Sequence, residues 1–278
     1  MIYVCEYDGS LDAQTLQHIS EQLPLTFPEG WQSGNKWEKA RHRILAWLLL
    51  AYGMKQIGFG VNQQTPGKKH VIEENQQLCR GIGEIFQKLA IMRDEHGKPY
   101  SSAHPESKFN LSHCDTACAC IVGWADAGVD IERKFAYRAS LARKVCHPRE
   151  AEILGRLDQE ECQRQLRLLW SLKESFVKLD GRGLGYGMDR IDLSGFLPIK
   201  VSGIYDKEET AFRDSGIYNK EETAFRGSGM YNKEETAFRI AEYDTYTLAA
   251  CSKDHRMLDV KCISEQELLE KIEGEERL

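Results

Sequence analysis

Helical and strand-like segments are mixed along this chain of 278 residues, and their order is the feature that most constrains its fold. A helix on a core repeats its apolar residues every three to four positions, whereas a half-buried strand repeats them every second position. Helical spacing occurs at 11–23, 36–54, 71–89, 149–157, 162–179 and from 264 onward. Strand-like patterns occur at 1–8, 109–111, 117–124 and 128–132, with a predicted hairpin turn at 125–128. The turn-rich segment 60–70 is predicted to be a loop.

The composition is that of an ordinary globular protein, with 41% hydrophobic and 29% charged residues. The net charge of −6 argues against a general nucleic-acid-binding protein, which is normally basic. The chain opens without the pattern of a signal peptide, and its most apolar run, 44–54, is shorter than the roughly 20 residues that span a bilayer. Nine cysteines without a C-x-x-C pair favour free thiols. We therefore expect a cytoplasmic protein that binds neither nucleic acid nor membrane.

Residues 203–241 are three tandem copies of thirteen residues that share the pattern Gly-x-Tyr-x-Lys-Glu-Glu-Thr-Ala-Phe-Arg. A short period usually indicates a stacked repeat architecture. Because this array has only three units within a non-repeating chain, we interpret it as a duplicated surface strand–turn unit, which surface loops tolerate. The alternative is an elongated ribbon that contacts a partner.

Asp130 and Glu132 lie in the strand-like segment Gly-Val-Asp-Ile-Glu at 128–132. Side chains alternate along a strand, so the two carboxylates share one face while Val129 and Ile131 point into the core. Two neighbouring carboxylates repel unless a cation lies between them, and oxygen ligands of this kind suit Mg²⁺ or Mn²⁺. The alternative interpretation is a half-buried strand with a solvated acidic face.

A second motif lies in the predicted helix 162–179, where Trp170, Glu174 and Lys178 recur at four-residue spacing. On a helix this spacing puts the indole, the carboxylate and the ammonium on one face. The alternative interpretation is a surface Glu–Lys pair worth about 0.2–0.5 kcal/mol. The glycine-rich segment that follows, 180–185, allows a backbone to approach a ligand closely.

Ser112 and His113 end the strand-like segment that begins at Phe109, and they offer a hydroxyl and an imidazole to a phosphate oxygen. The alternative is a structural histidine. The neighbouring cysteines match none of the usual structural zinc spacings, so we do not assign zinc to Cys114, Cys118 and Cys120.

Basic side chains recur along the predicted helix 36–54 and in a turn that contains Gly-Lys-Pro. Lys36, Lys39 and Arg43 lie along one helix face, and Lys98 lies in the turn. An arginine holds a phosphate through a bidentate fork. The alternative is a solvated charged face.

Each motif alone is weak, but their order resembles that of the Sfp-type 4′-phosphopantetheinyl transferases. The matching motifs are Gly97-Lys98-Pro99, Phe109-Asn110-Leu111-Ser112-His113, Gly128-Val129-Asp130-Ile131-Glu132, Trp170 to Lys178, and Gly183-Leu184. The resemblance extends from His42-Arg43 to the segment 246–251 and so spans most of the chain. The insertion around 60–80 and the repeat depart from the family pattern without touching a matched motif.

The resemblance implies an α/β (α+β) fold of two similar halves related by a pseudo-two-fold axis, with coenzyme A in the cleft between them. We expect the N-terminal half at 1–107 and the C-terminal half, with the metal site and the repeat, at 108–278. It also implies an enzyme that transfers the 4′-phosphopantetheine group of coenzyme A to a serine of an apo acyl or peptidyl carrier protein. The other product is adenosine 3′,5′-bisphosphate. A monomer is expected because both halves lie in one chain.

The same resemblance implies roles for the site residues. Asp130, Glu132 and Glu174 would hold Mg²⁺ or Mn²⁺. Lys178 would stabilise charge on the transferred phosphoryl group or protonate the leaving nucleotide. Glu174 would be the base for the serine or a metal ligand alone. The residues expected to bind the nucleotide half of coenzyme A are Arg43, Ser112 and His113 at its phosphates and Lys98 and Pro99 at its adenine.

Two other functions would use these residues: a coenzyme A-binding relative without catalysis, and a metal-dependent nucleotide hydrolase with water as the acceptor. A binder without catalysis has no need of all four of Asp130, Glu132, Glu174 and Lys178. The Ser-His and Gly-Lys-Pro elements fit a hydrolase less well. Transfer to a carrier protein is therefore our prediction.

Overall fold

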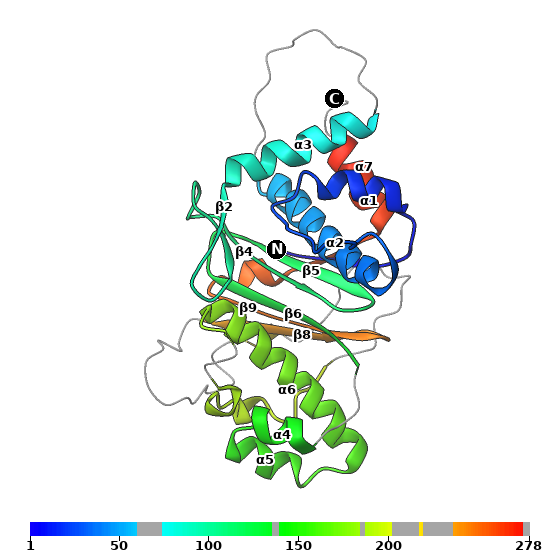
Figure 1. The fold of residues 1–278 in the computed structure, drawn as a ribbon. Helices are drawn as coiled ribbons and strands as arrows, with labels where there is room; N and C mark the ends of the chain where they lie inside the picture. The colour runs from blue at the N-terminus through cyan, green and yellow to red at the C-terminus, as the bar shows by residue number, and fades with distance from the viewer. Residues whose placement is uncertain (60–73, 135–138, 184–186, 202–216, 219–235, 275–278) are drawn as a thin grey trace. The chain divides into compact units, whose positions relative to one another are not determined.

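The computed structural model describes residues 1–59, 74–134, 139–183, 187–201, 217–218 and 236–274. The chain forms two compact units, Met1–Trp124 together with Lys261–Leu278, and Ala125–Val260 (Figure 1). Each unit combines a four-stranded sheet with helices, so the predicted mixed α/β class is confirmed. The predicted pseudo-two-fold axis stays a prediction. The residues 108–124, which we expected in the C-terminal half, provide two strands of the first unit's sheet.

The sheet of the first unit has the strand order β10-β1-β5-β4. Its strands are β1 (Ile2–Glu6), β4 (Lys108–His113), β5 (Ala117–Gly123) and β10 (Val260–Ile263). Both β1 and β4 run antiparallel to β5. The helices are α1 (Ala13–Ser20), α2 (Gly34–Gln56), α3 (Glu74–Leu89) and α7 (Glu265–Gly274). A separate hairpin pairs β2 (Ile91–Arg93) with β3 (Pro99–Ser101).

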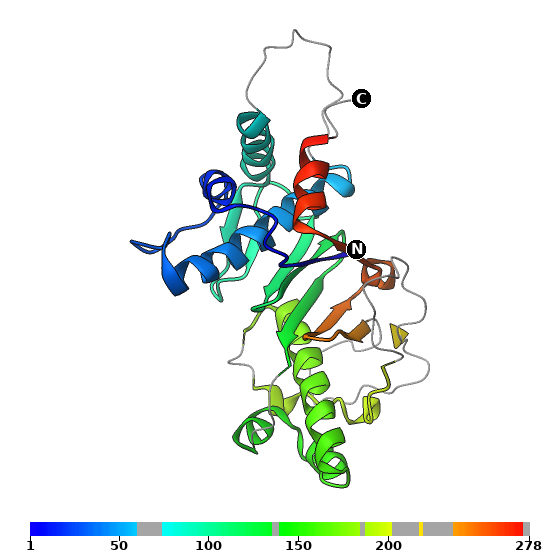
Figure 2. The same cartoon turned by 90° about the vertical axis from the view of Figure 1, so that its right-hand side faces the viewer.

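The core of this unit is built around α2, which lies against the sheet (Figure 2). The apolar run 44–54 is buried throughout, and Gly53 allows close packing, because a Cβ there would lie 2.9 Å from Val122 Cγ1. The run that is too short to span a bilayer is therefore a core helix. No helix in the described part of the chain is both long and apolar enough to cross a membrane.

The second unit has a sheet with the strand order β6-β9-β8-β7 and antiparallel pairing throughout. Its strands are β6 (Ala127–Arg133), β7 (Ile217–Tyr218), β8 (Ala237–Glu242) and β9 (Tyr246–Ser252). The α-helices are α4 (Ala139–Val145), α5 (Pro148–Leu154) and α6 (Gln159–Asp180). Short 3₁₀ turns occur at Met188–Arg190, Ser194–Phe196 and His255–Leu258.

Helix α6 packs on β6 at very close range beside Gly128. A Cβ at this position would lie 2.0 Å from the Ser175 carbonyl oxygen and 2.5 Å from the Leu179 nitrogen. Non-bonded carbon atoms in contact prefer separations of about 3.5–4.0 Å. Only a residue without a side chain fits this contact, which explains the glycine at the start of the Gly-Val-Asp-Ile-Glu motif.

A buried ion pair joins Lys173 of α6 to Glu150 of α5, and neither side chain has exposed surface. Lys173 Nζ lies 2.5 Å from Glu150 Oε2, and it also donates to the carbonyl oxygens of Val145 and Met188 at 2.7 and 3.0 Å. The two Glu150 oxygens also accept backbone N–H groups. The pair is therefore fully hydrogen-bonded, and it connects α6 to three neighbouring segments of the second unit.

The predicted helices and strands are confirmed with shifted ends, but one predicted strand pairing is wrong. We expected a hairpin at 125–128 between the strands that are now β5 and β6. Instead, β5 pairs with β1 and β4, whereas β6 pairs with β9, over 100 residues later in the chain. Helix α4 has no counterpart among the predicted elements. The predicted loop 60–70 lies outside the described residues, and of the repeat the structure describes 217–218 and 236–241.

Replacing Gly128 with alanine should strongly destabilise the second unit. The methyl group would force α6 away from β6, and overpacking of this kind costs typically about 1–3 kcal/mol or more. Urea unfolding followed by circular dichroism should show a lowered midpoint. Gly81 in α3 provides the matched control, because a Cβ there meets no atom within 4 Å. Gly81→Ala should stabilise the protein by about 0.5–1 kcal/mol. An unchanged midpoint for Gly128→Ala would contradict the close packing.

Lys173→Met should lower the free energy of unfolding by about 3–5 kcal/mol, because it leaves the buried carboxylate of Glu150 without its charge partner. The double variant Lys173→Met/Glu150→Leu should recover much of this loss, since apolar residues often replace a buried ion pair at little cost. Urea unfolding of the wild type, both single variants and the double variant measures the effect. A double variant less stable than Lys173→Met would show that this description of the pair is wrong.

Candidate functional site

An acidic cluster lies where β6 faces α6. Asp130 and Glu132 are two residues apart on β6, so their side chains share one face of the sheet. Lys178 of α6 reaches this face, and its Nζ lies 2.8 Å from Asp130 Oδ1. The Asp130 side chain is 6% exposed and that of Lys178 is 27% exposed. This ion pair therefore lies at the rim of the core, unlike the buried pair of Lys173.

Glu174 belongs to the same cluster, one helical turn before Lys178. Burial raises the pKa of Glu174 to about 7; the Lys178 ammonium opposes this rise, and the carboxylates of Asp130 and Glu132 add to it. Burial and the neighbouring Asp130 also raise the pKa of Glu132. The structure thus brings together the four charged residues that the two sequence motifs contributed.

The ends of α6 explain how the helix holds these residues in place. Asp158 caps its first turn by accepting the backbone N–H of Glu161. Gly181 ends it with a φ of 85°, a left-handed conformation that favours glycine. Between these ends, adjacent residues point to different sides of the helix: Lys173 enters the core, whereas Glu174 faces the cluster.

The chemistry of the donors in this cluster fits a divalent cation. Carboxylate oxygens are ligands that Mg²⁺ and Mn²⁺ prefer. Thr247, the register partner of Glu132 on β9, carries a buried hydroxyl that makes no hydrogen bond within the described residues. In that part of the chain, no three acidic, histidine or cysteine side chains are gathered closely enough to hold a metal ion as they stand. Because Lys178 neutralises Asp130 here, the binding of a cation requires this ion pair to rearrange.

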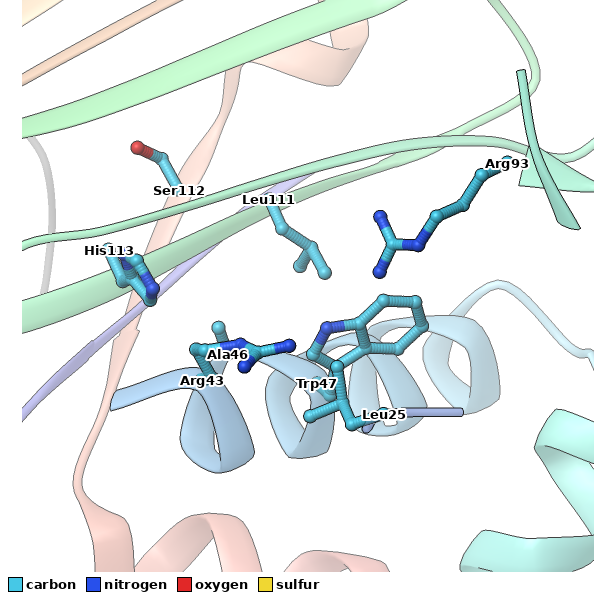
Figure 3. Close-up of a pocket in the computed structure, with 8 residues that line it drawn as sticks. All are labelled: Leu25, Arg43, Ala46, Trp47, Arg93, Leu111, Ser112 and His113. Atoms are coloured by element: carbon cyan, nitrogen blue, oxygen red, sulfur yellow. The ribbon is translucent and has the colours of Figure 1, made fainter. Parts of the chain in front are cut away.

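A second candidate site is a pocket of about 230 Å³ within the first unit (Figure 3). Its floor and walls come from α2, from β2, from β4 and from the segment before α2. The lining residues are Leu25, Arg43, Ala46, Trp47, Arg93, Leu111, Ser112 and His113. Three residues that we predicted to bind phosphate, Arg43, Ser112 and His113, therefore meet at one pocket.

Two arginines share this pocket. Burial and the nearby Arg93 guanidinium lower the pKa of Arg43, so the two like charges act on each other. Arg93 Nη1 also donates to the Gly97 carbonyl oxygen at 2.9 Å. A pocket with two guanidinium groups and an imidazole is suited to a phosphate group, whereas the Ser112 hydroxyl points to the other side of β4, away from Arg43 (Figure 3).

Sequence reasoning missed Arg93. Its signal is its position in the segment Arg-Asp-Glu-His-Gly-Lys-Pro, directly before the predicted turn. Pairing of β2 with β3 brings Arg93 opposite Pro99. That pairing depends on the turn, where Asp94 Oδ1 accepts the backbone N–H of Lys98 at 2.9 Å.

Not every predicted nucleotide-binding residue lines the pocket. Lys98 and Pro99 belong to the hairpin that carries Arg93 but are absent from the pocket lining. Lys36 and Lys39 are exposed on α2 and also lie outside the lining. Lys36 Nζ donates instead to the Glu29 carbonyl oxygen at 3.2 Å.

Comparison with known proteins places similarity in the part of the chain that carries the acidic cluster. Residues 126–226 match the family model of the 4′-phosphopantetheinyl transferase superfamily. A 4′-phosphopantetheinyl transferase of Bacillus subtilis is 35% identical over 95 residues, which cover 34% of this chain and 42% of the relative. The 4′-phosphopantetheinyl transferase Sfp of Bacillus subtilis strain 168 is 33% identical over 95 residues, with coverage of 34% and 42%. The 4′-phosphopantetheinyl transferase HetI of Nostoc is 35% identical over 79 residues, covering 27% and 33%.

The chain spans less than half the length of each of these relatives. The stretch that matches the family model contains Asp130, Glu132, Glu174 and Lys178. The order of the sequence motifs and these similarities agree. Over part of its length, the chain is therefore similar to 4′-phosphopantetheinyl transferases, the transferase Sfp among them.

Proposed function

We propose that this chain transfers the 4′-phosphopantetheine group of coenzyme A to a serine hydroxyl of an apo acyl or peptidyl carrier protein. The serine oxygen forms a bond to the phosphorus that carries the pantetheine arm, and the bond from that phosphorus to the leaving adenosine 3′,5′-bisphosphate breaks. The observation that carries the proposal is the cluster of Asp130, Glu132, Glu174 and Lys178, which lies inside the stretch that matches the family model.

The acidic cluster would supply charge neutralisation. Mg²⁺ or Mn²⁺ held by Asp130, Glu132 and Glu174 would neutralise the pyrophosphate and polarise its phosphorus. Phosphoryl transfer needs positioning and charge neutralisation more than covalent help from the protein. Lys178 would stabilise the negative charge that develops on the transferred phosphoryl group, or it would protonate the leaving nucleotide. Glu174 takes the serine proton, directly or through water.

We assign the arginine pocket to the phosphates of the nucleotide half of coenzyme A. The support is that Arg43 and Arg93 share the pocket with Ser112 and His113. An anion between two guanidinium groups relieves their repulsion and accepts paired hydrogen bonds from each. Lys98 and Pro99 stay at the adenine in this proposal, on the hairpin that also carries Arg93. The monomeric state and the cytoplasmic location stay predictions.

Mass spectrometry separates this proposal from its alternatives. The full chain is incubated with coenzyme A, Mg²⁺ and an apo carrier protein, in parallel for carriers of fatty-acid, polyketide and peptide synthesis. We expect at least one carrier to gain the mass of one phosphopantetheine as adenosine 3′,5′-bisphosphate accumulates. Binding of coenzyme A without any product would indicate a non-catalytic relative. Accumulation of the bisphosphate with unmodified carriers would indicate a hydrolase.

Asp130→Asn and Glu132→Gln should each lower the transfer rate at least about tenfold at saturating Mg²⁺, a loss of about 1.4 kcal/mol or more in transition-state stabilisation. The amides keep the size of the side chains but remove the charges that attract a cation. Asp126→Asn is the matched control, because Asp126 is 44% exposed and pairs with Lys253. Electron paramagnetic resonance of bound Mn²⁺ separates loss of the metal from loss of chemistry. Wild-type rates in either variant would contradict the metal role of that residue.

Arg43→Met and Arg93→Met should each raise the Kd for adenosine 3′,5′-bisphosphate roughly 10–100-fold, because hydrogen bonds to charged groups contribute about 1.5–3 kcal/mol. Isothermal titration calorimetry measures the change. Arg156→Met is the control, because Arg156 is 73% exposed and pairs with Glu152 at the surface. Unchanged affinity in both pocket variants would show that the nucleotide phosphates bind elsewhere.

A further inference from the structure

A stack of aromatic rings lies beside Arg43, formed by two residues of the segment before α2 and one of α2 itself. Phe27 stacks on Trp31 with 4.4 Å between ring centroids, and Trp31 stacks on Trp37 with 5.7 Å. The guanidinium carbon of Arg43 lies over the Phe27 ring, 5.2 Å from its centroid. Arg43 therefore forms one end of a series of four planar groups.

This stack ties an irregular segment to a helix. Residues 24–33 form neither helix nor strand, whereas Trp37 and Arg43 both belong to α2. Phe27 contacts both Arg43 and Trp31, and Trp31 contacts Trp37, so the stack runs from one residue of α2 to another through the irregular segment. Leu25, two residues before Phe27, lines the pocket. Phe27 therefore contacts Arg43 from the same segment that contributes Leu25 to the pocket lining.

The contact with the Phe27 ring matters for Arg43 because Arg93, which also lines the pocket, carries the same positive charge. Arg93 lines the same pocket, and repulsion between two guanidinium groups favours side-chain conformations that move them apart. The face of an aromatic ring attracts a guanidinium group. Arg43 Nη1 also lies within hydrogen-bonding distance of the Thr26 carbonyl oxygen, at 3.5 Å. Both contacts come from adjacent residues of one segment, and both hold Arg43 against the repulsion.

We propose that Phe27 is a positioning residue for Arg43 and that its ring sets the affinity of the pocket for the phosphates of the nucleotide. The ring holds the guanidinium ready before the ligand arrives, so that less conformational freedom is lost on binding. The proposal rests on the proposed function, because it takes the pocket to bind coenzyme A and its nucleotide product.

The test compares variants of Phe27 in the full chain, with adenosine 3′,5′-bisphosphate as the probe in calorimetry. Phe27→Leu keeps an apolar side chain but removes the ring, and we expect a Kd about fivefold higher, corresponding to about 1 kcal/mol. Phe27→Tyr keeps the ring and should preserve the affinity. Trp37→Leu is the matched control, because it removes a ring from the other end of the stack. In kinetics with a carrier protein, Phe27→Leu should raise the KM for coenzyme A and leave kcat unchanged.

A double-mutant cycle then shows whether Phe27 acts through Arg43. In the Arg43→Met background, Phe27→Leu should cause no further loss of affinity. An equal loss in both backgrounds, or a loss in Trp37→Leu as large as in Phe27→Leu, would overturn the proposal. So would wild-type affinity in Phe27→Leu. Failure of the proposed function would be seen in a different experiment, in which the wild type modifies no carrier protein. The calorimetric cycle measures nucleotide binding alone, so its result does not depend on that outcome.

Discussion

The close contact between α6 and β6 at Gly128 determines where the charged side chains of the second unit lie. Because glycine has no Cβ, the helix backbone approaches the strand to a distance that a methyl group would prevent. Two residues further along the strand, Asp130 meets Lys178 at 2.8 Å. A larger separation would admit water, which weakens the interaction between charges. The Gly-Val-Asp-Ile-Glu motif thus serves packing and chemistry together. Its glycine lets α6 approach β6 closely, and this approach brings Lys178 of α6 within reach of the carboxylate of Asp130.

Two lysines of α6 form ion pairs with different physical roles. Lys173 and Glu150 have no exposed surface, and each has further hydrogen bonds to backbone groups. Such a pair has no means to rearrange without leaving a charge unpaired in the core, so its role is structural. Lys178 is partly exposed and meets Asp130 beside two further carboxylates. Solvent reaches this pair, and alternative partners lie beside it, so it is able to rearrange when a ligand arrives.

Local patterns in the sequence predicted the secondary structure and the acidic cluster, because both depend on spacing within one strand or one helix. The two-residue spacing of Asp130 and Glu132 and the four-residue spacing of Glu174 and Lys178 are of this kind. The failures concern partners distant in sequence. Nothing near residues 125–128 indicates that β6 pairs with β9 rather than with β5. Arg93 was missed for a related reason, because its place in the pocket depends on strand pairing with the segment that holds Pro99.

Each unit contains a group of like charges whose proximity is unfavourable in the free protein. The second unit holds three carboxylates against one ammonium, and the first holds two guanidinium groups in one pocket. Packing retains both groups: the Gly128 contact fixes the carboxylates, and the Phe27 ring lies over one guanidinium. Proteins keep such local conflicts where a ligand resolves them. A cation would resolve the first conflict and an anion such as a phosphate the second, so each unit carries a site whose charge calls for a ligand of the opposite sign.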